Sequence, residues 1–290
     1  ARVNTAEVAV LATADDPRLD RIRDLAPHLG APVTVRTDPS ACLLSGPLTT
    51  GEAAALRQLG AEGHIDLLIR PDIPTSARRL VMLDVDSTMI RNEVIELLAE
   101  EAGCGDRVAD ITSRAMAGEL DFTGSLTERV ALLAGLDAGA IDRARERMEL
   151  TCGADRLVDE LHAAGHVVAV VSGGFTPFTE HLRDLLGLDH ARANTLEVID
   201  GQLTGRVLGE IVDAEVKTRT LIEVAASYDI LLEHTVAIGD GANDLGMITA
   251  AGIGIAFCAK PVVRAGADAS ISVPRLDAVL ALLGVGAPGR

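Results

Sequence analysis

The first residues that could do chemistry are two carboxylates, Asp84 and Asp86, in the run Asp84-Val85-Asp86-Ser87-Thr88. They follow an apolar segment at 80–83, and side chains two positions apart on an extended segment face the same side. Both carboxylates can therefore point into one site. The alternative is an acidic pair in a solvated loop, which a lone D-x-D pattern does not exclude.

Two glycine-rich segments follow later apolar runs. Ser172-Gly173-Gly174 offers a hydroxyl and glycine-flanked amides that suit an anion, although a plain strand-to-helix turn has the same composition. In Gly239-Asp240-Gly241-Ala242-Asn243-Asp244, the glycines permit a tight turn, and Asp240 and Asp244 are hard oxygen ligands suited to Mg²⁺. A helix start capped by Asn243 is the alternative there, and it leaves Asp240 unexplained.

Lysine is rare in this chain: of 26 basic residues, only Lys217 and Lys260 are lysines. A lysine near the start of a helix is usually a solvated surface charge. Because the chain uses arginine almost everywhere else, lysine at 217 indicates a need for a compact ammonium. An ammonium is a good partner for a phosphoryl oxygen beside a carboxylate. We assign no comparable role to Lys260.

Alternating strand and helix patterns from residue 80 onward would bring these segments together. Continuous apolar strands indicate a parallel sheet covered on both faces, an α/β fold. The predicted strands are 80–86, 166–171, 234–238, 253–257 and 270–273, and the predicted helices are 176–187, 215–228 and 243–251.

Two insertions interrupt this alternation. Residues 91–151 are helical throughout, and we expect them to form a cap over the carboxyl edge of the sheet, where open α/β sheets bind ligands. Residues 196–208 contain Asp200-Gly201 between alternating runs, which predicts a hairpin.

The first 70 residues predict a separate, small ferredoxin-like α+β domain. Their strand and helix patterns follow the order βαββαβ, with strands at 6–12, 32–36, 41–45 and 64–70 and helices at 17–29 and 51–60. A proline-containing linker covers 71–79. We therefore expect domains at 1–72 and 79–284 and a flexible tail at 285–290.

The bulk composition excludes several classes of partner. A net charge of −17 argues against a nucleic-acid or anionic-membrane surface. The four cysteines are far apart, without a C-x-x-C pair, which favours reduced thiols in a cytoplasmic protein over disulfides or zinc. No apolar run approaches the length of a membrane span, and no signal-peptide pattern is present.

In combination, D-x-D-S-T, S-G-G, a lysine and G-D-G-x-N-D resemble the haloacid dehalogenase superfamily of aspartyl-phosphate phosphatases, over about residues 80–283. The helical block is similar to that of the phosphoserine phosphatases, in Glu93, Met116-Ala117-Gly118-Glu119-Leu120-Asp121-Phe122 and Arg129. Gly124 departs from the larger residue of that pattern, which puts local packing of the cap in doubt. The first 70 residues resemble at most ACT-like domains. The resemblance implies a Rossmann-like core with the inserted cap.

The resemblance also implies a mechanism. Asp84 attacks phosphorus, and Asp86 protonates the departing serine oxygen and later activates water. Mg²⁺ is held by the Asp84 carboxylate, the Asp86 carbonyl and the Asp240 carboxylate. Phosphoryl charge is neutralised by the metal, Ser172, the Gly173-Gly174 segment and Lys217.

The same resemblance implies phosphoserine as the substrate and the last step of serine biosynthesis as the role. Glu93 and Arg129 match its ammonium and carboxylate, where the alternative is a pair of solvated helix charges. Met116 and Phe122 exclude water, and Asn243 orients Lys217 or phosphate.

Three other functions stay open. The chain could be another small-molecule phosphatase of the superfamily, or a phosphotransferase that passes phosphate to an alcohol such as homoserine. It could also be a sensor, in which the N-terminal domain binds an amino acid. A homodimer formed through the N-terminal domain also stays open.

Overall fold

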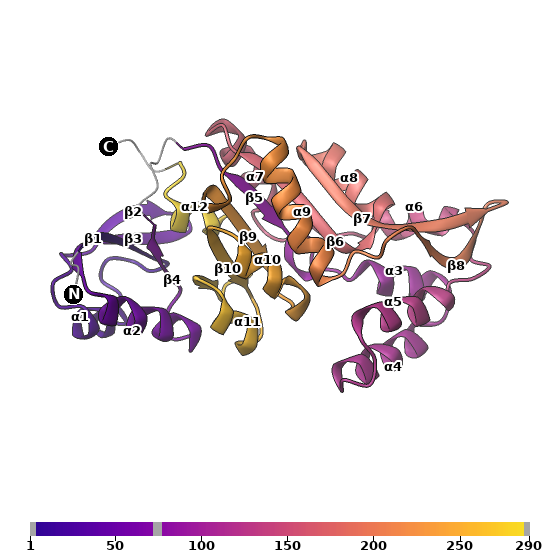
Figure 1. Ribbon diagram of the computed structural model, residues 1–290, viewed down its shortest axis with the longest axis horizontal. Helices are drawn as coiled ribbons and strands as arrows, with labels where there is room; N and C mark the ends of the chain where they lie inside the picture. Colours follow the sequence, from indigo (N-terminus) through magenta and orange to yellow (C-terminus); the bar gives the residue numbers. More distant parts are fainter. Residues whose placement is uncertain (1–3, 72–76, 287–290) are drawn as a thin grey trace.

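The computed structural model describes residues 4–71 and 77–286, which form two sheets with their helices (Figure 1). Most of the predicted linker, at 72–76, lies outside the described residues. The smaller sheet has the order β2-β3-β1-β4 with antiparallel neighbours, so the predicted βαββαβ order is observed. Its elements are β1 (Asn4–Val10), α1 (Leu19–Leu25), β2 (Val33–Thr37), β3 (Ser40–Leu48), α2 (Thr50–Ala61) and β4 (Leu67–Arg70).

The larger sheet confirms the predicted α/β fold. Its order is β11-β10-β9-β5-β6-β7-β8, with parallel pairing except between β7 and β8, where Asp200-Gly201 closes the predicted hairpin. Its strands are β5 (Leu80–Leu83), β6 (Val167–Phe175), β7 (His190–Ile199), β8 (Gln202–Leu208), β9 (Thr235–Gly239), β10 (Ile253–Phe257) and β11 (Ala269–Ile271).

Strand β5 lies in the middle of this sheet, and its four apolar residues explain why helices cover both faces. Val81 and Leu83 belong to one buried cluster, whereas Leu80 and Met82 belong to a second on the opposite face, as the strand's two-residue period requires. The covering helices are α7 (Ala154–Ala163), α8 (Thr176–Leu186), α9 (Ala214–Ser227), α10 (Leu245–Ala250), α11 (Pro261–Gly266) and α12 (Ala278–Leu283).

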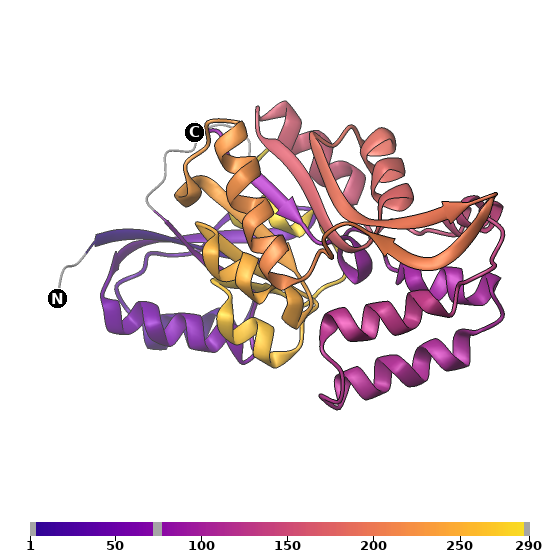
Figure 2. The ribbon, with the colours of Figure 1, turned by 45° about the vertical axis from the view of Figure 1, so that its right-hand side comes forward.

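The helical block after β5 forms a lobe at one side of the sheet (Figures 1 and 2). Its two connections to the core run together, because Ile90 pairs with Leu150 in an antiparallel bridge and the Arg91 N–H donates to the carbonyl of Glu149. The lobe contains α3 (Val94–Glu101), α4 (Gly105–Met116), α5 (Phe122–Ala131) and α6 (Gly139–Glu146).

The two sheets share a core. Helices α1 and α2 pack on one face of the smaller sheet, and α12 contacts its strands β1, β3 and β4. Ala9, Leu43 and Leu68 of the smaller sheet belong to the same buried cluster as Val279 and Leu280 of α12. The N-terminal region is therefore packed directly on a helix that belongs to the larger sheet's layer.

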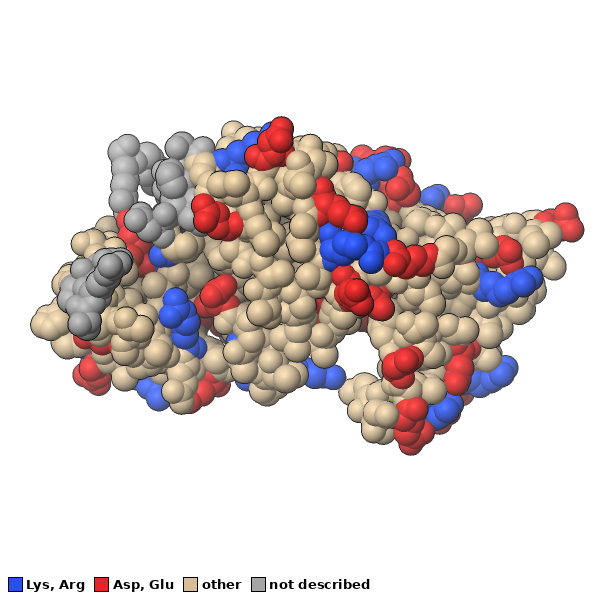
Figure 3. All heavy atoms as spheres, viewed as in Figure 1, with Lys and Arg blue, Asp and Glu red and all other residues tan. Residues whose placement is uncertain are grey.

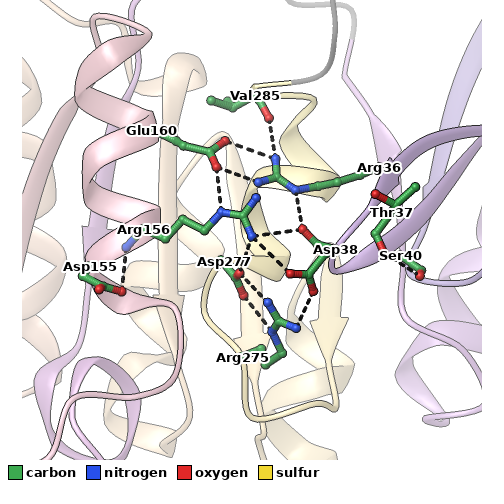
Figure 4. A network of polar contacts seen from close by, with 10 residues as sticks. All are labelled: Arg36, Thr37, Asp38, Ser40, Asp155, Arg156, Glu160, Arg275, Asp277 and Val285. Atoms are coloured by element: carbon green, nitrogen blue, oxygen red, sulfur yellow. Dashed lines mark hydrogen bonds and ion pairs between the residues drawn. The ribbon is translucent and has the colours of Figure 1, made fainter.

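A polar network closes one end of this interface (Figure 4). Arg36 forms an ion pair with Glu160 of α7 at 2.7 Å, and Arg275 forms one with Asp38 at 2.7 Å. Arg36 also donates to the carbonyl of Val285. Of the flexible tail expected at 285–290, residues 287–290 lie outside the described residues. Val285 is buried, because its apolar side chain packs in the interface beside α12.

Basic and acidic side chains of the described residues lie close together on the face shown in Figure 3, which also has a notch between the lobe carrying α4 and the body of the molecule. Among the described helices, none has the length and apolar character needed to cross a membrane.

Candidate active site

The predicted chemical residues meet at the carboxyl ends of β5, β6 and β9. Asp84 follows β5, Ser172-Gly173-Gly174 lies in β6, and Asp240 follows β9. Lys217 reaches the same place from α9, whose first turn is capped by Asp213. Four segments that are distant in the sequence therefore converge, as the motif spacing predicts.

Lys217 is the electrostatic centre of the cluster. Its ammonium lies 2.7 Å from Oδ1 of Asp84 and 2.7 Å from Oδ1 of Asp244, and its side chain is fully buried. Oδ1 of Asp84 also accepts from the Val85 N–H at 2.8 Å. Both contacts engage the same oxygen and so fix the rotation of the Asp84 carboxylate.

Asp86 is held separately, on the other side of the same loop. Its Oδ1 accepts from the Val94 N–H at 3.0 Å, and its Oδ2 accepts from the Ser172 hydroxyl at 3.3 Å. Burial and the nearby Glu93 raise the pKa of Asp86 to about 7. The group can therefore give and take a proton near neutral pH.

A metal ion would fit the carboxylates of Asp84, Asp240 and Asp244, whose ligand atoms all lie within 4.8 Å of one another. Burial and Asp244 raise the pKa of Asp84, and the same two causes raise the pKa of Asp240 to about 6. Three carboxylates, of which Asp84 and Asp244 are buried and Asp240 is half-buried, thus lie near one ammonium, an excess of negative charge that a divalent cation would balance. Oxygen ligands of this kind suit a hard cation.

Above the carboxylates lies a cavity of about 530 Å³ between the core and the lobe. Ser172 and Lys217 are buried beneath it, and Met116 is 70% exposed at its rim. The other predicted site residues all line it: Asp84, Asp86, Glu93, Met116, Phe122, Arg129, Gly173, Gly174, Asp240 and Asn243.

The two glycines are required by close contacts. A Cβ on Gly173 would lie 2.7 Å from the Phe122 ring, and one on Gly174 would lie 2.7 Å from Val94 and 2.8 Å from Asp86. The backbone of this loop can therefore approach both the lobe and the catalytic carboxylate only without side chains.

Glu93 and Arg129 carry opposite charges in the wall of the cavity. Glu93 accepts from the Ser87 hydroxyl at 2.7 Å, and burial raises its pKa. Arg129 donates through Nε to the carbonyl of Ser125 at 3.2 Å, and burial lowers its pKa. The cavity therefore offers an anion and a cation besides the carboxylate cluster.

The roles of two residues were not anticipated from the sequence. Asp244 was expected only as an oxygen ligand, yet it is a partner of Lys217 and also accepts from the Gly241 N–H. Thr88 donates to Oδ1 of Asp240 at 2.9 Å and so orients that carboxylate. Both residues stand inside the motifs, which is the signal that could have identified them.

Comparison with known proteins defines the class. The family model for haloacid dehalogenase-like hydrolases matches residues 81–249, so the chain belongs to this family. A HAD-family hydrolase from Salmonella enterica has a similar structure, with a TM-score of 0.86, 33% identity and coverage of 96% of this chain and 98% of that one.

Within the family, several similar curated proteins are phosphoserine phosphatases. That of Streptomyces coelicolor is 50% identical over 97% of this chain, which spans 67% of its length. That of Streptococcus thermophilus is 51% identical over 72% of this chain and 97% of its own length. A solved phosphoserine phosphatase holding a phospho-aspartyl intermediate analogue has a TM-score of 0.67 and 45% identity, and covers 70% of this chain and 98% of that one.

Proposed function

We propose that this chain is a phosphoserine phosphatase, which hydrolyses O-phosphoserine to serine and phosphate as the last step of serine biosynthesis. The observation that carries the proposal is the buried Asp84–Lys217 pair at the base of a cavity whose wall carries Glu93 and Arg129. The similarity to phosphoserine phosphatases over nearly the whole chain supports the same conclusion.

Asp84 is the nucleophile. One of its carboxylate oxygens attacks phosphorus and forms an aspartyl-phosphate while the bond from phosphorus to the serine oxygen breaks. Asp86 gives its proton to the departing oxygen. Water then attacks phosphorus, its proton passes to Asp86, and the bond to Asp84 breaks to release phosphate. The pKa of Asp86 near 7 supports both proton transfers.

Charge neutralisation is the main electrostatic task in this chemistry. Ser172, the Gly173 amide and Lys217 stabilise the phosphoryl oxygens from one side. Mg²⁺ is the proposed cofactor; the carboxylates of Asp84 and Asp240 and the carbonyl of Asp86 would hold it, with the Asp244 carboxylate close by. When bound, it supplies positive charge that neutralises phosphoryl oxygens.

The substrate is selected by its other two charges. Arg129 binds the carboxylate of phosphoserine, and Glu93 binds its ammonium. Phe122 shields the bound ester from water, Met116 lies at the exposed rim of the cavity, and Asn243 orients phosphate. A sugar phosphate or phosphoglycolate lacks the ammonium that Glu93 would match, so this pair favours phosphoserine over those substrates.

The experiment is phosphate release from a panel of phosphomonoesters, with and without EDTA. We expect phosphoserine to be hydrolysed much faster than a sugar phosphate or phosphoglycolate, and EDTA to abolish activity until Mg²⁺ is added. Adding homoserine tests the phosphotransferase alternative, because transfer would lower phosphate release and form phosphohomoserine. Equal rates across the panel would refute the substrate assignment.

We also propose that residues 1–72 form an ACT-like regulatory or oligomerising domain, that residues 79–284 form the phosphatase domain, and that the enzyme works in the cytoplasm as a homodimer. The four cysteines are free thiols, which supports a reducing compartment. Sedimentation with and without serine tests the assembly and its response to an amino acid.

A further inference from the structure

The phosphoryl-binding segment of β6 is a bulge. In the register of β6 with β7, Val171 stands opposite Arg192 and Phe175 stands opposite Asn194. Three residues of β6, Ser172 to Gly174, therefore face a single residue of β7. Such an irregularity removes ladder hydrogen bonds, so the backbone groups of the bulge need other partners.

Asn194 supplies one of these partners. Its Nδ2 donates to the carbonyl of Gly173 at 2.8 Å, and its Oδ1 accepts from the Val212 N–H at 2.8 Å. The side chain is 1% exposed. Since a carbonyl only accepts and an amide N–H only donates, these partners fix the orientation of the carboxamide.

The two segments that Asn194 joins both carry phosphoryl-binding groups. Gly173 presents its amide beside Ser172, and Phe122 of the lobe packs against its Cα. Val212 immediately precedes Asp213, which caps α9, and the N–H of Lys217 donates to the Asp213 carbonyl. One side chain thus spans the distance between the anion-binding loop and the helix that carries the ammonium.

We propose that Asn194 is a positioning residue for phosphoryl transfer, which fixes the Gly173 amide relative to Lys217. It does not touch the substrate, and it acts equally on every phosphomonoester. The proposal rests on the proposed phosphatase activity, but it does not depend on which ester is the natural substrate.

The test compares Asn194→Leu with Thr235→Val. Thr235 is a matched control, because it is also 1% exposed and also joins two backbone segments. Its hydroxyl donates to the Leu232 carbonyl at 2.6 Å and accepts from the Gly252 N–H at 3.2 Å. It stands at the first residue of β9, at the end of the sheet opposite the site. Both substitutions replace a buried bridging side chain with an apolar one of similar size.

We expect both variants to unfold at a lower temperature, because each leaves buried backbone groups unpaired. Only Asn194→Leu should lower kcat, by about tenfold to a hundredfold, since small displacements of reacting groups have effects of this size. The loss should be the same on phosphoserine and on p-nitrophenyl phosphate. Calorimetry should show that the affinity of Asn194→Leu for inorganic phosphate is lower than that of the parent by roughly fivefold or more.

If Asn194→Leu does not fold, Asn194→Asp provides the test. It keeps the acceptor for Val212 but replaces the donor to Gly173 with a carboxylate oxygen and adds a negative charge, so it should lose at least as much rate and phosphate affinity. A folded Asn194 variant with kcat and phosphate affinity within twofold of the parent overturns the proposal. A Thr235→Val variant that loses as much kcat and phosphate affinity as the Asn194 variant also overturns the proposal. A parent protein that binds phosphate but hydrolyses neither ester counts against the proposed function instead, and phosphate affinity then decides the role of Asn194.

Discussion

The ammonium of Lys217 lies 2.7 Å from Oδ1 of Asp84, in a position closed to solvent. Burial alone would lower the pKa of this lysine, but Asp244 and Asp84 together raise it above its ordinary value. The lysine therefore stays charged at neutral pH. Its position beside the proposed nucleophile gives the transferring phosphoryl group a fixed cation on the protein side.

Replacing Lys217 by Met should reduce both rate and stability. The substitution preserves most of the side-chain volume but leaves the carboxylates of Asp84 and Asp244 without a buried counter-charge, which costs about 3–5 kcal/mol. We expect kcat to fall by about a hundredfold or more. Urea unfolding and phosphate release measure the two effects. Lys260→Met is the matched control, since Lys260 is exposed, and it should change neither quantity.

Replacing Asp84 by Asn should abolish turnover and leave the fold intact, because a carboxamide is not a competent nucleophile here. Acid quenching of the parent enzyme during turnover should trap phosphate on the protein, and the variant should trap none. Circular dichroism checks the fold. A variant that keeps a normal rate would exclude Asp84 as the nucleophile.

Replacing Arg129 by Ala should damage the use of phosphoserine selectively. Loss of a charge-assisted hydrogen bond to the substrate carboxylate predicts a fall in kcat/KM of roughly tenfold to a hundredfold. An aryl phosphate lacks that carboxylate and should be spared. Arg107→Ala, on the exposed face of the same lobe, serves as the control. Equal losses of kcat/KM on phosphoserine and on the aryl phosphate would contradict the role of Arg129 in binding the substrate carboxylate.

Stability without metal should depend on pH through Asp86 and Asp240. Their pKa values are raised to about 7 and about 6, mainly by burial, from an ordinary value of 3.8. Between pH 4 and 7 the folded protein holds protons that the unfolded chain has released, so raising the pH across this window destabilises the fold. The midpoint of thermal unfolding in EDTA should therefore fall as the pH is raised from 4 to 7.

The same experiment has two internal comparisons. Asp86→Asn should flatten the pH dependence, because the group that titrates has been removed. Mg²⁺ should raise the midpoint most at pH 7, where the carboxylates are charged. If the unfolding midpoint in EDTA falls as steeply with pH for the variant as for the parent, Asp86 is not a cause of the pH dependence.

The N-terminal region should be anchored by Asp66. This buried carboxylate accepts from both the N–H and the hydroxyl of Ser272, which follows β11 of the other sheet. Asp66→Ala should lower the free energy of unfolding by about 1–3 kcal/mol, since both donors lose their partner. Asp20→Ala, at an exposed position on α1, should have little effect. Equal unfolding curves for the two variants would contradict this role.

The sequence predicted the site better than it predicted the scaffold. Lys217 could be assigned because lysine is rare in this chain, and Asp84, Ser172 and Asp240 could be assigned because each stands in a short motif at the end of an apolar strand. Their convergence then follows from parallel pairing alone, which brings the carboxyl ends of strands to one edge. Thr88 and Asn194 were not assigned, because their importance lies in hydrogen bonds that depend on register and on a bulge.

Helices α7, α11 and α12 were not predicted. The six residues of α12 (Ala278–Leu283) are all buried, so the segment has no polar face and no helical period to detect. Predicted boundaries elsewhere differ by a few residues: the expected strand 80–86 ends at Leu83, where the chain turns so that Asp84 and Asp86 can enter the site. Such ends depend on tertiary contacts.

Helix α12 is enclosed by α7 on one side and the smaller sheet on the other. If residues 1–71 were removed, this wholly apolar helix would be exposed to solvent. The shortened enzyme would then have an exposed apolar patch that favours self-association. Work on an isolated phosphatase fragment should therefore begin by replacing Leu280 or Leu283 with polar residues. In this chain residues 4–71 form one wall of the phosphatase's own hydrophobic interior.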